Sequence, residues 1–155
     1  MSIFNIRVYG ILINENNEVL VTDEFRVGTE ITKFPGGGLI WGEGMTDCLK
    51  REFREELGCE IEVLQHFYTT DYFQLSAFHT EHQIISVYYL VRAPSLKDFA
   101  PAINFQEKHE QNHPFNKGKK EGAQSFRWIS LSKINSAEFT LPIDKKVAEM
   151  LRDQK

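Results

Sequence analysis

The chain has 155 residues, of which 41% are hydrophobic and 26% charged, with a formal net charge of -4. This length predicts one domain, residues 1–155, with a substantial core. The acidic balance argues against general nucleic-acid binding, which favours basic proteins. No stretch approaches the length of a membrane span, and the first residues lack a secretory signal. We therefore expect a cytoplasmic protein with no membrane partner.

The first third of the chain alternates β-forming runs with turn residues. Residues 3–13 and 18–25 each predict a strand, and the polar residues 14–17 between them favour a turn. We therefore expect these two strands to form a β-hairpin. Residues 31–34 predict a further short strand, which leads into Pro35 and three successive glycines.

A charged helix is expected after the glycines. Thr46 suits its N-cap, Asp47 complements the helix dipole, and Gly58 suits a left-handed C-terminus. Apolar residues recur every fourth position along one side, which predicts a face packed against a sheet. The members of this stripe are Leu49, Phe53 and Leu57. The helix segment also holds Cys48 and, just after it, Cys59, which we expect to be reduced and partly buried.

The other side of this helix carries closely spaced negative charge. Glu52, Glu55 and Glu56 stand at i, i+3 and i+4 and therefore share one face. Three carboxylates this close repel one another, and a hard divalent cation that prefers oxygen ligands would relieve the repulsion. The alternative is a solvated charged face, the usual meaning of such a pattern.

The rest of the chain predicts more strands, one long irregular segment and a terminal helix. Residues 59–72 predict a strand with Ile61, Val63 and Leu64 facing inward, and His82–Arg92 gives the strongest strand pattern of the chain. Residues 94–122 have no clear period and predict a functional loop. The remaining predicted elements are a strand at 123–129, a short helix at 131–134 and a helix at 142–152. Mixed strands with two main helices predict an α/β (α+β) fold.

The segment from residue 37 to 59 resembles the Nudix box. The family pattern is G-x5-E-x7-R-E-U-x-E-E-x-G-U, in which U is a bulky apolar residue, and every fixed position is met. The matching residues are Gly37, Glu43, Arg51, Glu52, Phe53, Glu55, Glu56, Gly58 and Cys59. Many family members carry an accessory glutamate where this chain has Ile40, which leaves the number of metal ions open. The resemblance implies a Nudix-type α/β/α sandwich with a mixed β-sheet.

The resemblance also implies a reaction. Nudix enzymes hydrolyse the pyrophosphate bond of a nucleoside diphosphate linked to a moiety X, with Mg²⁺ or Mn²⁺ as cofactor. A small nucleotide substrate is therefore expected: a nucleoside triphosphate, a nucleotide sugar or an ADP-ribose type compound. The metal ligands that the resemblance implies are Glu52, Glu55, Glu56 and the carbonyl of Gly36. It implies catalytic roles for Glu52, Arg51 and Glu55, with Glu43 and Arg51 orienting the ligands.

Residues outside the pattern are candidates for binding the substrate or for supplying the base. Trp41 is either a core residue or a lid over a nucleobase, and Tyr72 or Phe73 would stack on a base. Some family members take the catalytic base from a late loop. The alternatives to Glu52 are therefore Glu107, Glu110 and Glu121. The spacing of residues 79–82, with two histidines around a carboxylate, favours a hairpin loop over a zinc site.

Two functions remain open at this stage. One is a Nudix pyrophosphohydrolase, and the other is a sensor of the same fold that binds a nucleotide or nucleotide sugar without cleaving it. The intact motif favours the enzyme. We also expect a homodimer, with the N-terminal β-strands as a suitable interface.

Overall fold

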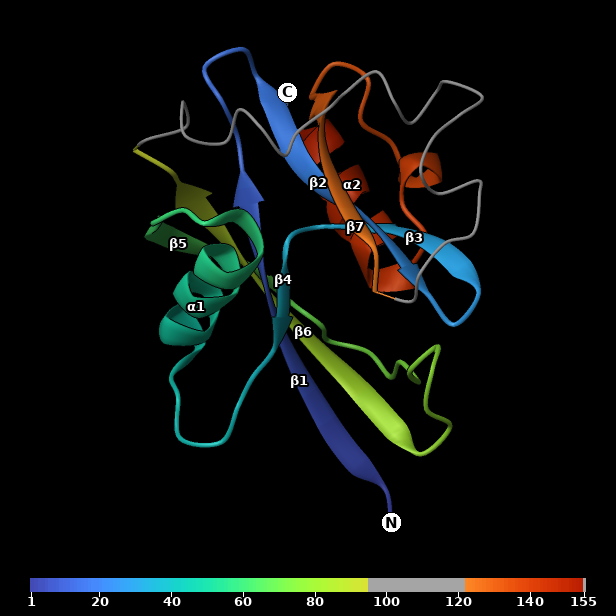
Figure 1. The fold of residues 1–155 in the computed structure, drawn as a ribbon. Coiled ribbons are helices and arrows are strands. Elements are labelled where there is room, and N and C mark those ends of the chain that lie inside the picture. Colours follow the sequence, from blue (N-terminus) through green and yellow to red (C-terminus); the bar gives the residue numbers. More distant parts are fainter. Residues whose placement is uncertain (95–121, 155) are drawn as a thin grey trace. The chain divides into compact units, whose positions relative to one another are not determined.

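The computed structural model describes residues 1–94 and 122–154. Its strands, in chain order, are β1 (Ile3–Leu12), β2 (Glu18–Arg26), β3 (Thr29–Lys33), β4 (Gly36–Gly38), β5 (Glu62–Thr69), β6 (His82–Arg92) and β7 (Gln124–Ser130). Its helices are α1 (Met45–Leu57), the 3-10 helix η3 (Ser136–Glu138) and α2 (Pro142–Asp153) (Figure 1). These elements form two compact units, Met1–Ile13 with Pro35–Asp98 and Asn14–Phe34 with Phe99–Lys155.

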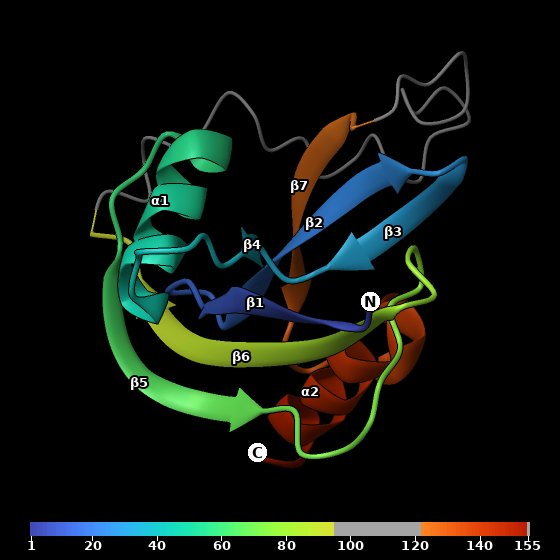
Figure 2. The same ribbon diagram turned by 90° about the horizontal axis from the view of Figure 1, so that it is seen from below.

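The first unit is a mixed sheet with one helix. Its strand order is β4-β1-β6-β5, with β1 parallel to β6 and antiparallel to β4. Helix α1 covers one face of this sheet (Figure 2), and its fully buried Phe53 packs against Gly10 of β1. A Cβ at Gly10 would lie 2.7 Å from the Phe53 ring, so the helix approaches the sheet closely only because Gly10 has no side chain.

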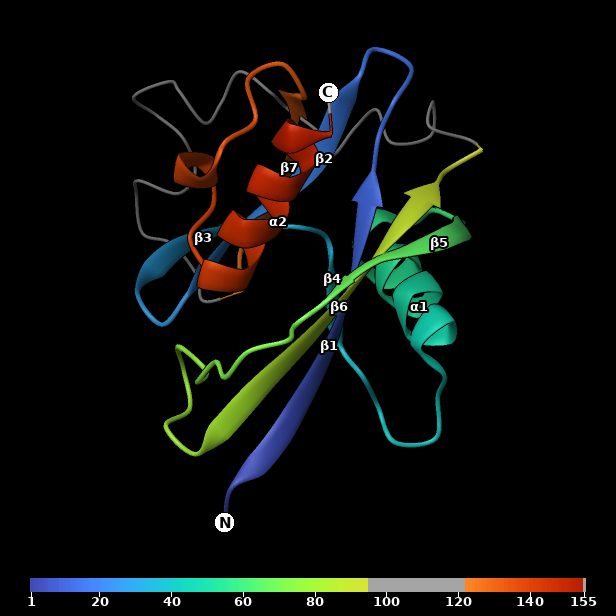
Figure 3. The same cartoon turned by 180° about the vertical axis from the view of Figure 1, so that it is seen from behind.

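The second unit is an antiparallel sheet with order β3-β2-β7, and α2 lies over one of its faces (Figure 3). Strands β2 and β3 form a hairpin through Val27 and Gly28, which have φ angles of 48° and 72°. Two successive positive φ angles match the type I′ turns that suit the twist of a two-residue hairpin. The apolar stripe of α2 is buried and comprises Ile143, Val147, Ala148 and Leu151.

The predicted hairpin of the first two strands is wrong. The turn itself forms, because the Asn14 side chain accepts hydrogen bonds from the backbone N–H groups of Asn16 and Glu18, each at 2.9 Å. However, β1 pairs with β4 and β6, whereas β2 pairs with β3 and β7. The C-terminal half of β1 is buried at every residue. A strand buried on both faces suits the interior of a mixed sheet, which the local turn residues cannot indicate.

Several element boundaries also differ from the predictions. Helix α1 begins after Gly44, not Thr46, although Asp47 in the first turn and the left-handed Gly58 at the end are confirmed. The short helix predicted at 131–134 is wrong: the 3-10 helix forms later, where Asn135 accepts a hydrogen bond from the N–H of Ala137. Leu64, predicted to face inward, is 55% exposed.

The mixed α+β class is confirmed, as are strand β6 with its predicted bounds and the start of α2 at Pro142. Both cysteines are buried and free, in agreement with the sequence. The irregular segment predicted at 94–122 lies almost entirely outside the described residues. Within the described ranges, neither α1 nor α2 is long and apolar enough to cross a membrane.

Candidate active site

The site begins with strand β4, which consists of glycines alone. β4 lies at the edge of its sheet and pairs with Arg7–Tyr9 of β1. Gly36 has a φ angle of 147°, and a Cβ there would lie 2.1 Å from the carbonyl oxygen of Val8. Any other residue at this position would therefore clash with the neighbouring strand. The glycines bring the main chain of β4 close to both β1 and α1.

Gly37 places β4 directly beside the motif helix. A Cβ on Gly37 would lie 2.4 Å from both Cδ and Oε1 of Glu52, which is inside the volume of the carboxylate. The Glu52 side chain is only 13% exposed, so it occupies the space that the missing side chain leaves. The first glycine of the motif and the first glutamate of its helix thus form one packed contact.

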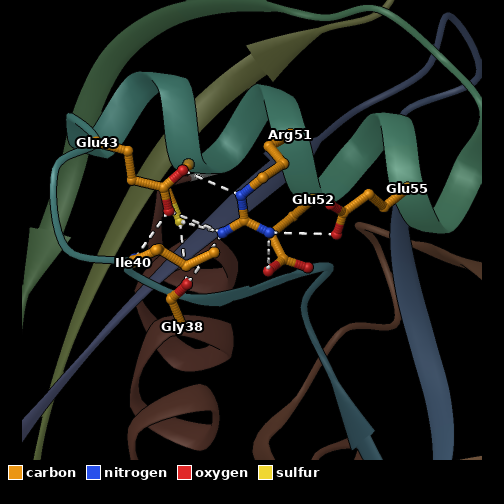
Figure 4. Close-up of polar contacts among 7 residues, drawn as sticks. Gly38, Ile40, Glu43, Arg51, Glu52 and Glu55 are labelled. Atoms are coloured by element: carbon orange, nitrogen blue, oxygen red, sulfur yellow. Dashed lines mark hydrogen bonds and ion pairs between the residues drawn. The ribbon is translucent and has the colours of Figure 1, made fainter.

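Arg51 is the centre of the polar network (Figure 4). Its guanidinium donates to both carboxylate oxygens of Glu43, from Nε at 3.0 Å and from Nη2 at 2.8 Å. Nη2 also donates to the carbonyl oxygen of Gly38 at 3.2 Å. The carboxylate of Glu43 accepts a further hydrogen bond from the N–H of Ile40 at 2.9 Å. This two-pronged pairing fixes the plane of the guanidinium relative to the loop that precedes α1.

The same guanidinium gathers two glutamates of the motif helix. Nη1 of Arg51 donates to Oε1 of Glu52 at 2.9 Å and to Oε2 of Glu55 at 3.2 Å. Figure 4 shows both carboxylates pointing to this one nitrogen from neighbouring turns of α1. Glu56 lies on the same helix and is partly buried. The structure thus brings Arg51 into direct contact with Glu43, Glu52 and Glu55.

The electrostatics of the network follow from these contacts. Hydrogen bonds from Arg51, then from the N–H of Ile40, lower the pKa of Glu43 from 4.5 to about 2. The hydrogen bond to Glu43 in turn raises the pKa of Arg51 above its usual range. Burial, followed by the nearby Glu43, raises the pKa of the Cys48 thiol to about 12. The network therefore holds Glu43 ionised and Cys48 protonated at neutral pH.

The donor chemistry fits a hard divalent cation. Glu52 and Glu55 converge on a single positively charged donor, and carboxylate oxygens are the ligands that Mg²⁺ and Mn²⁺ prefer. Among the described residues no group of three or more acidic, histidine or cysteine side chains is arranged to hold a metal ion. Glu52 and Glu55 instead bind Arg51. The Glu55 side chain is 60% exposed, so it has room to turn toward a cation.

The predicted residues outside the motif have mixed outcomes. Trp41 is 99% exposed, which excludes the core alternative, and Tyr72 and Phe73 are 37% and 66% exposed. Glu107, Glu110 and Glu121 lie outside the described residues. The rings of His79 and His82 lie 4.7 Å apart and belong to no group of three potential metal ligands in residues 1–94 and 122–154.

Two backbone groups of the network and one side chain close to it were not predicted from the sequence. The Gly38 carbonyl and the Ile40 N–H hold Arg51 and Glu43, but backbone groups leave no trace in residue identity. Arg7, on β1, lies beside Gly38 as well. The isolated arginine in an apolar strand was the only sequence signal for it.

Comparison with known proteins identifies the class. A family model described as the NUDIX domain matches residues 4–151, which include parts of both units. The chain therefore belongs to the NUDIX family, and its complete Nudix box makes it a Nudix pyrophosphohydrolase. Members of this family generally use a divalent metal. None of the curated proteins compared with the chain matches it.

Solved structures show the same fold at low identity. A MutT protein from Methanosarcina mazei is 19% identical with a TM-score of 0.65, over 99% of this chain and 96% of that one. A structure from a study of MutT from Aliivibrio salmonicida and Vibrio cholerae is 19% identical with a TM-score of 0.58, over 98% and 99%. An ADP-ribose pyrophosphatase from Streptococcus suis is 18% identical with a TM-score of 0.57, over 95% and 86%.

Proposed function

We propose that this protein hydrolyses the pyrophosphate bond of a nucleoside diphosphate linked to a moiety X, with Mg²⁺ or Mn²⁺ bound by the motif glutamates. The observation that carries the proposal is the convergence of Glu52 and Glu55 on Nη1 of Arg51, at 2.9 and 3.2 Å. An ordinary solvated helix face would leave these carboxylates apart and in water. Here the two carboxylates share one guanidinium, and that of Glu52 is packed against Gly37 of β4.

The motif residues would supply the metal ligands and the base in this proposal. Glu52, Glu55 and Glu56, with the carbonyl of Gly36, would hold the metal ions. When bound, a divalent cation neutralises charge on the phosphate oxygens and makes water a stronger nucleophile. Glu52 is the candidate base that takes the proton from the attacking water. Its contact with Gly37 restricts the positions that its carboxylate can adopt.

Arg51 and Glu43 position the catalytic groups. Glu43 holds the guanidinium through two hydrogen bonds, and the guanidinium in turn orients Glu52 and Glu55. Removing either partner would cost the other its two hydrogen bonds in this pair, and the guanidinium would lose the contact that fixes its plane. This arrangement holds the carboxylates of Glu52 and Glu55 close together, as ligands of a shared cation must be.

The substrate class is a small nucleotide: a nucleoside triphosphate, a nucleotide sugar or an ADP-ribose type compound. The similarity to an ADP-ribose pyrophosphatase and to MutT proteins is compatible with each of these and selects none. We further propose that the two units form a single Nudix domain, and that the protein acts as a cytoplasmic homodimer. Gel filtration with light scattering would test the dimer.

The experiment that tests the function is a hydrolysis screen with the purified protein. The panel holds nucleoside triphosphates, oxidised nucleotides, ADP-ribose, nucleotide sugars and dinucleoside polyphosphates, with products identified by mass. We expect turnover of one class in Mg²⁺, loss of turnover in EDTA and recovery when Mg²⁺ is restored. Turnover that is indifferent to EDTA would contradict the metal mechanism. Tight binding of one compound without turnover would instead support a sensor.

A further inference from the structure

Arg7 lies beside the site but outside the Nudix box. It stands on β1 opposite Gly38 of β4. A Cβ on Gly38 would lie 3.7 Å from Nη1 of Arg7, which is ordinary van der Waals distance. Successive residues of a strand point to opposite faces, and the Cβ direction of Gly37 points to Glu52. Arg7 and Glu52 therefore lie on opposite faces of the same glycine strand.

The guanidinium of Arg7 is hydrogen-bonded to a buried tyrosine on its own strand. Its Nε donates to the hydroxyl of Tyr9 at 2.6 Å, and its central carbon lies 5.8 Å from the centre of the Tyr9 ring. Tyr9 is 3% exposed and packs against Tyr88 with ring centroids 5.2 Å apart. Because the ring is buried and packed, the hydrogen bond anchors Nε of Arg7 to a fixed group, while Nη1 lies next to Gly38.

Gly38 is therefore flanked by two guanidinium groups. Arg51 donates to its carbonyl oxygen at 3.2 Å, while Arg7 approaches its α-carbon from the other face. β4 is an edge strand of three glycines, so it has no side chain on the face of Arg51 or on the face of Arg7. Arg51 is engaged by carboxylates that organise the site. Arg7 presents its positive charge on the face away from these carboxylates.

We propose that Arg7 binds a phosphate of the substrate, on the face of β4 opposite Glu52. The planar fork of a guanidinium matches two phosphate oxygens better than an ammonium group does. This inference rests on the proposed function and adds to it a residue that recognises the diphosphate portion common to all candidate substrates. Arg7 acts on binding, so its loss raises KM and leaves the chemistry on the motif helix in place.

The test uses inorganic pyrophosphate, titrated calorimetrically into the full-length protein in the presence of Mg²⁺. Arg7→Gln should weaken binding by at least about tenfold, and Arg7→Lys should lie between it and the wild type, because Lys keeps the charge and loses the fork. Tyr9→Phe keeps the packing and removes the hydroxyl that orients Arg7, so it should weaken binding by a few-fold. Arg92→Gln is the matched control: Arg92 lies on β6, is paired with Glu62 and should bind as the wild type does.

The outcomes separate this inference from the proposed function. Tenfold weaker pyrophosphate binding by Arg7→Gln, with a raised KM and a kcat within about threefold of wild type, supports the role of Arg7. Equal binding by Arg7→Gln and wild type, with hydrolysis intact, overturns the role of Arg7 alone. A wild-type protein that neither binds pyrophosphate nor hydrolyses any panel compound overturns both. Thermal unfolding of Arg7→Gln and Arg7→Lys checks that each variant is folded.

Discussion

The α-carbon of Gly37 lies against the carboxylate of Glu52, so closely that a methyl group on Gly37 would sit 2.4 Å from the Glu52 carboxyl carbon. This contact explains in physical terms why the motif needs glycine at a position without a positive φ angle. The backbone of Gly37 would accept any residue, but the space is taken by the glutamate. The strand thereby sets where the carboxylate can stand.

Gly37→Ala should displace Glu52 without unfolding the protein. Because a shift of about 1 Å in a catalytic group can cost 10²-fold, we expect kcat to fall roughly 10- to 100-fold. Steady-state kinetics on the substrate found in the screen would measure this. Gly44→Ala is the control, since its Cβ would meet only the exposed Asp47 carboxylate, at 3.3 Å. Normal kcat in Gly37→Ala would show that the position of Glu52 is not critical.

The ion pair of Glu43 and Arg51 should make the stability of the folded protein decrease at low pH. The pKa of Glu43 in the folded state, about 2, lies below its ordinary 4.5. Stability from this pair is therefore fully present above about pH 4.5 and is lost as the pH falls toward 2. The Glu43→Gln variant has no carboxylate at this position, so its stability lacks this pH-dependent contribution. The Tm difference between wild type and Glu43→Gln should shrink over this range, and a constant difference would contradict the assignment.

The catalytic base can be assigned by comparing two substitutions. If Glu52 is the base, Glu52→Gln should lower kcat by roughly 10²- to 10⁴-fold, whereas Glu121→Gln should have a mild effect. The reverse order would move the base to the late segment that holds Glu121. Circular dichroism of both variants would show that the fold is kept.

The two cysteines should be unreactive in the folded protein. Burial raises the pKa of Cys48 to about 12 and that of Cys59 to about 11, so both thiols stay protonated at mildly alkaline pH. Titration with a disulfide reagent at about pH 8 should modify neither thiol until guanidinium chloride is added. Rapid modification of either cysteine in the native protein would contradict this burial.

Much of the site was predictable because its residues sit on one helix at fixed spacing. Helical geometry alone brings Glu52, Glu55 and Glu56 to one face and leaves Phe53 on the neighbouring buried face. The partner of β1 was not predictable in this way. Turn residues after β1 indicate where the chain bends, but pairing with β6 depends on residues about eighty positions away in the sequence.

The N-cap of α1 and the position of Arg7 were also not predictable from the sequence. Gly44 replaces Thr46 as N-cap because the backbone of Gly44, with φ -80° and ψ 162°, is extended, while Thr46 already lies in the helix. A side-chain preference cannot reveal this. Arg7 was not predictable as a neighbour of Gly38, because the register of β1 and β4 brings the two residues together although they are far apart in the sequence. Contacts formed across strands are the part of the site that a single sequence does not contain.

The central claim is that the motif glutamates bind a divalent cation. The most direct measurement is a binding titration with Mn²⁺, in which the electron paramagnetic resonance signal reports the free ion. Wild type should bind, and Glu56→Gln should bind at least about tenfold more weakly. Glu60→Gln is the matched control. Glu60 lies beyond the end of α1 and pairs with Arg54, so its substitution should leave Mn²⁺ binding unchanged. Unaltered Mn²⁺ binding by Glu56→Gln would contradict the proposed site.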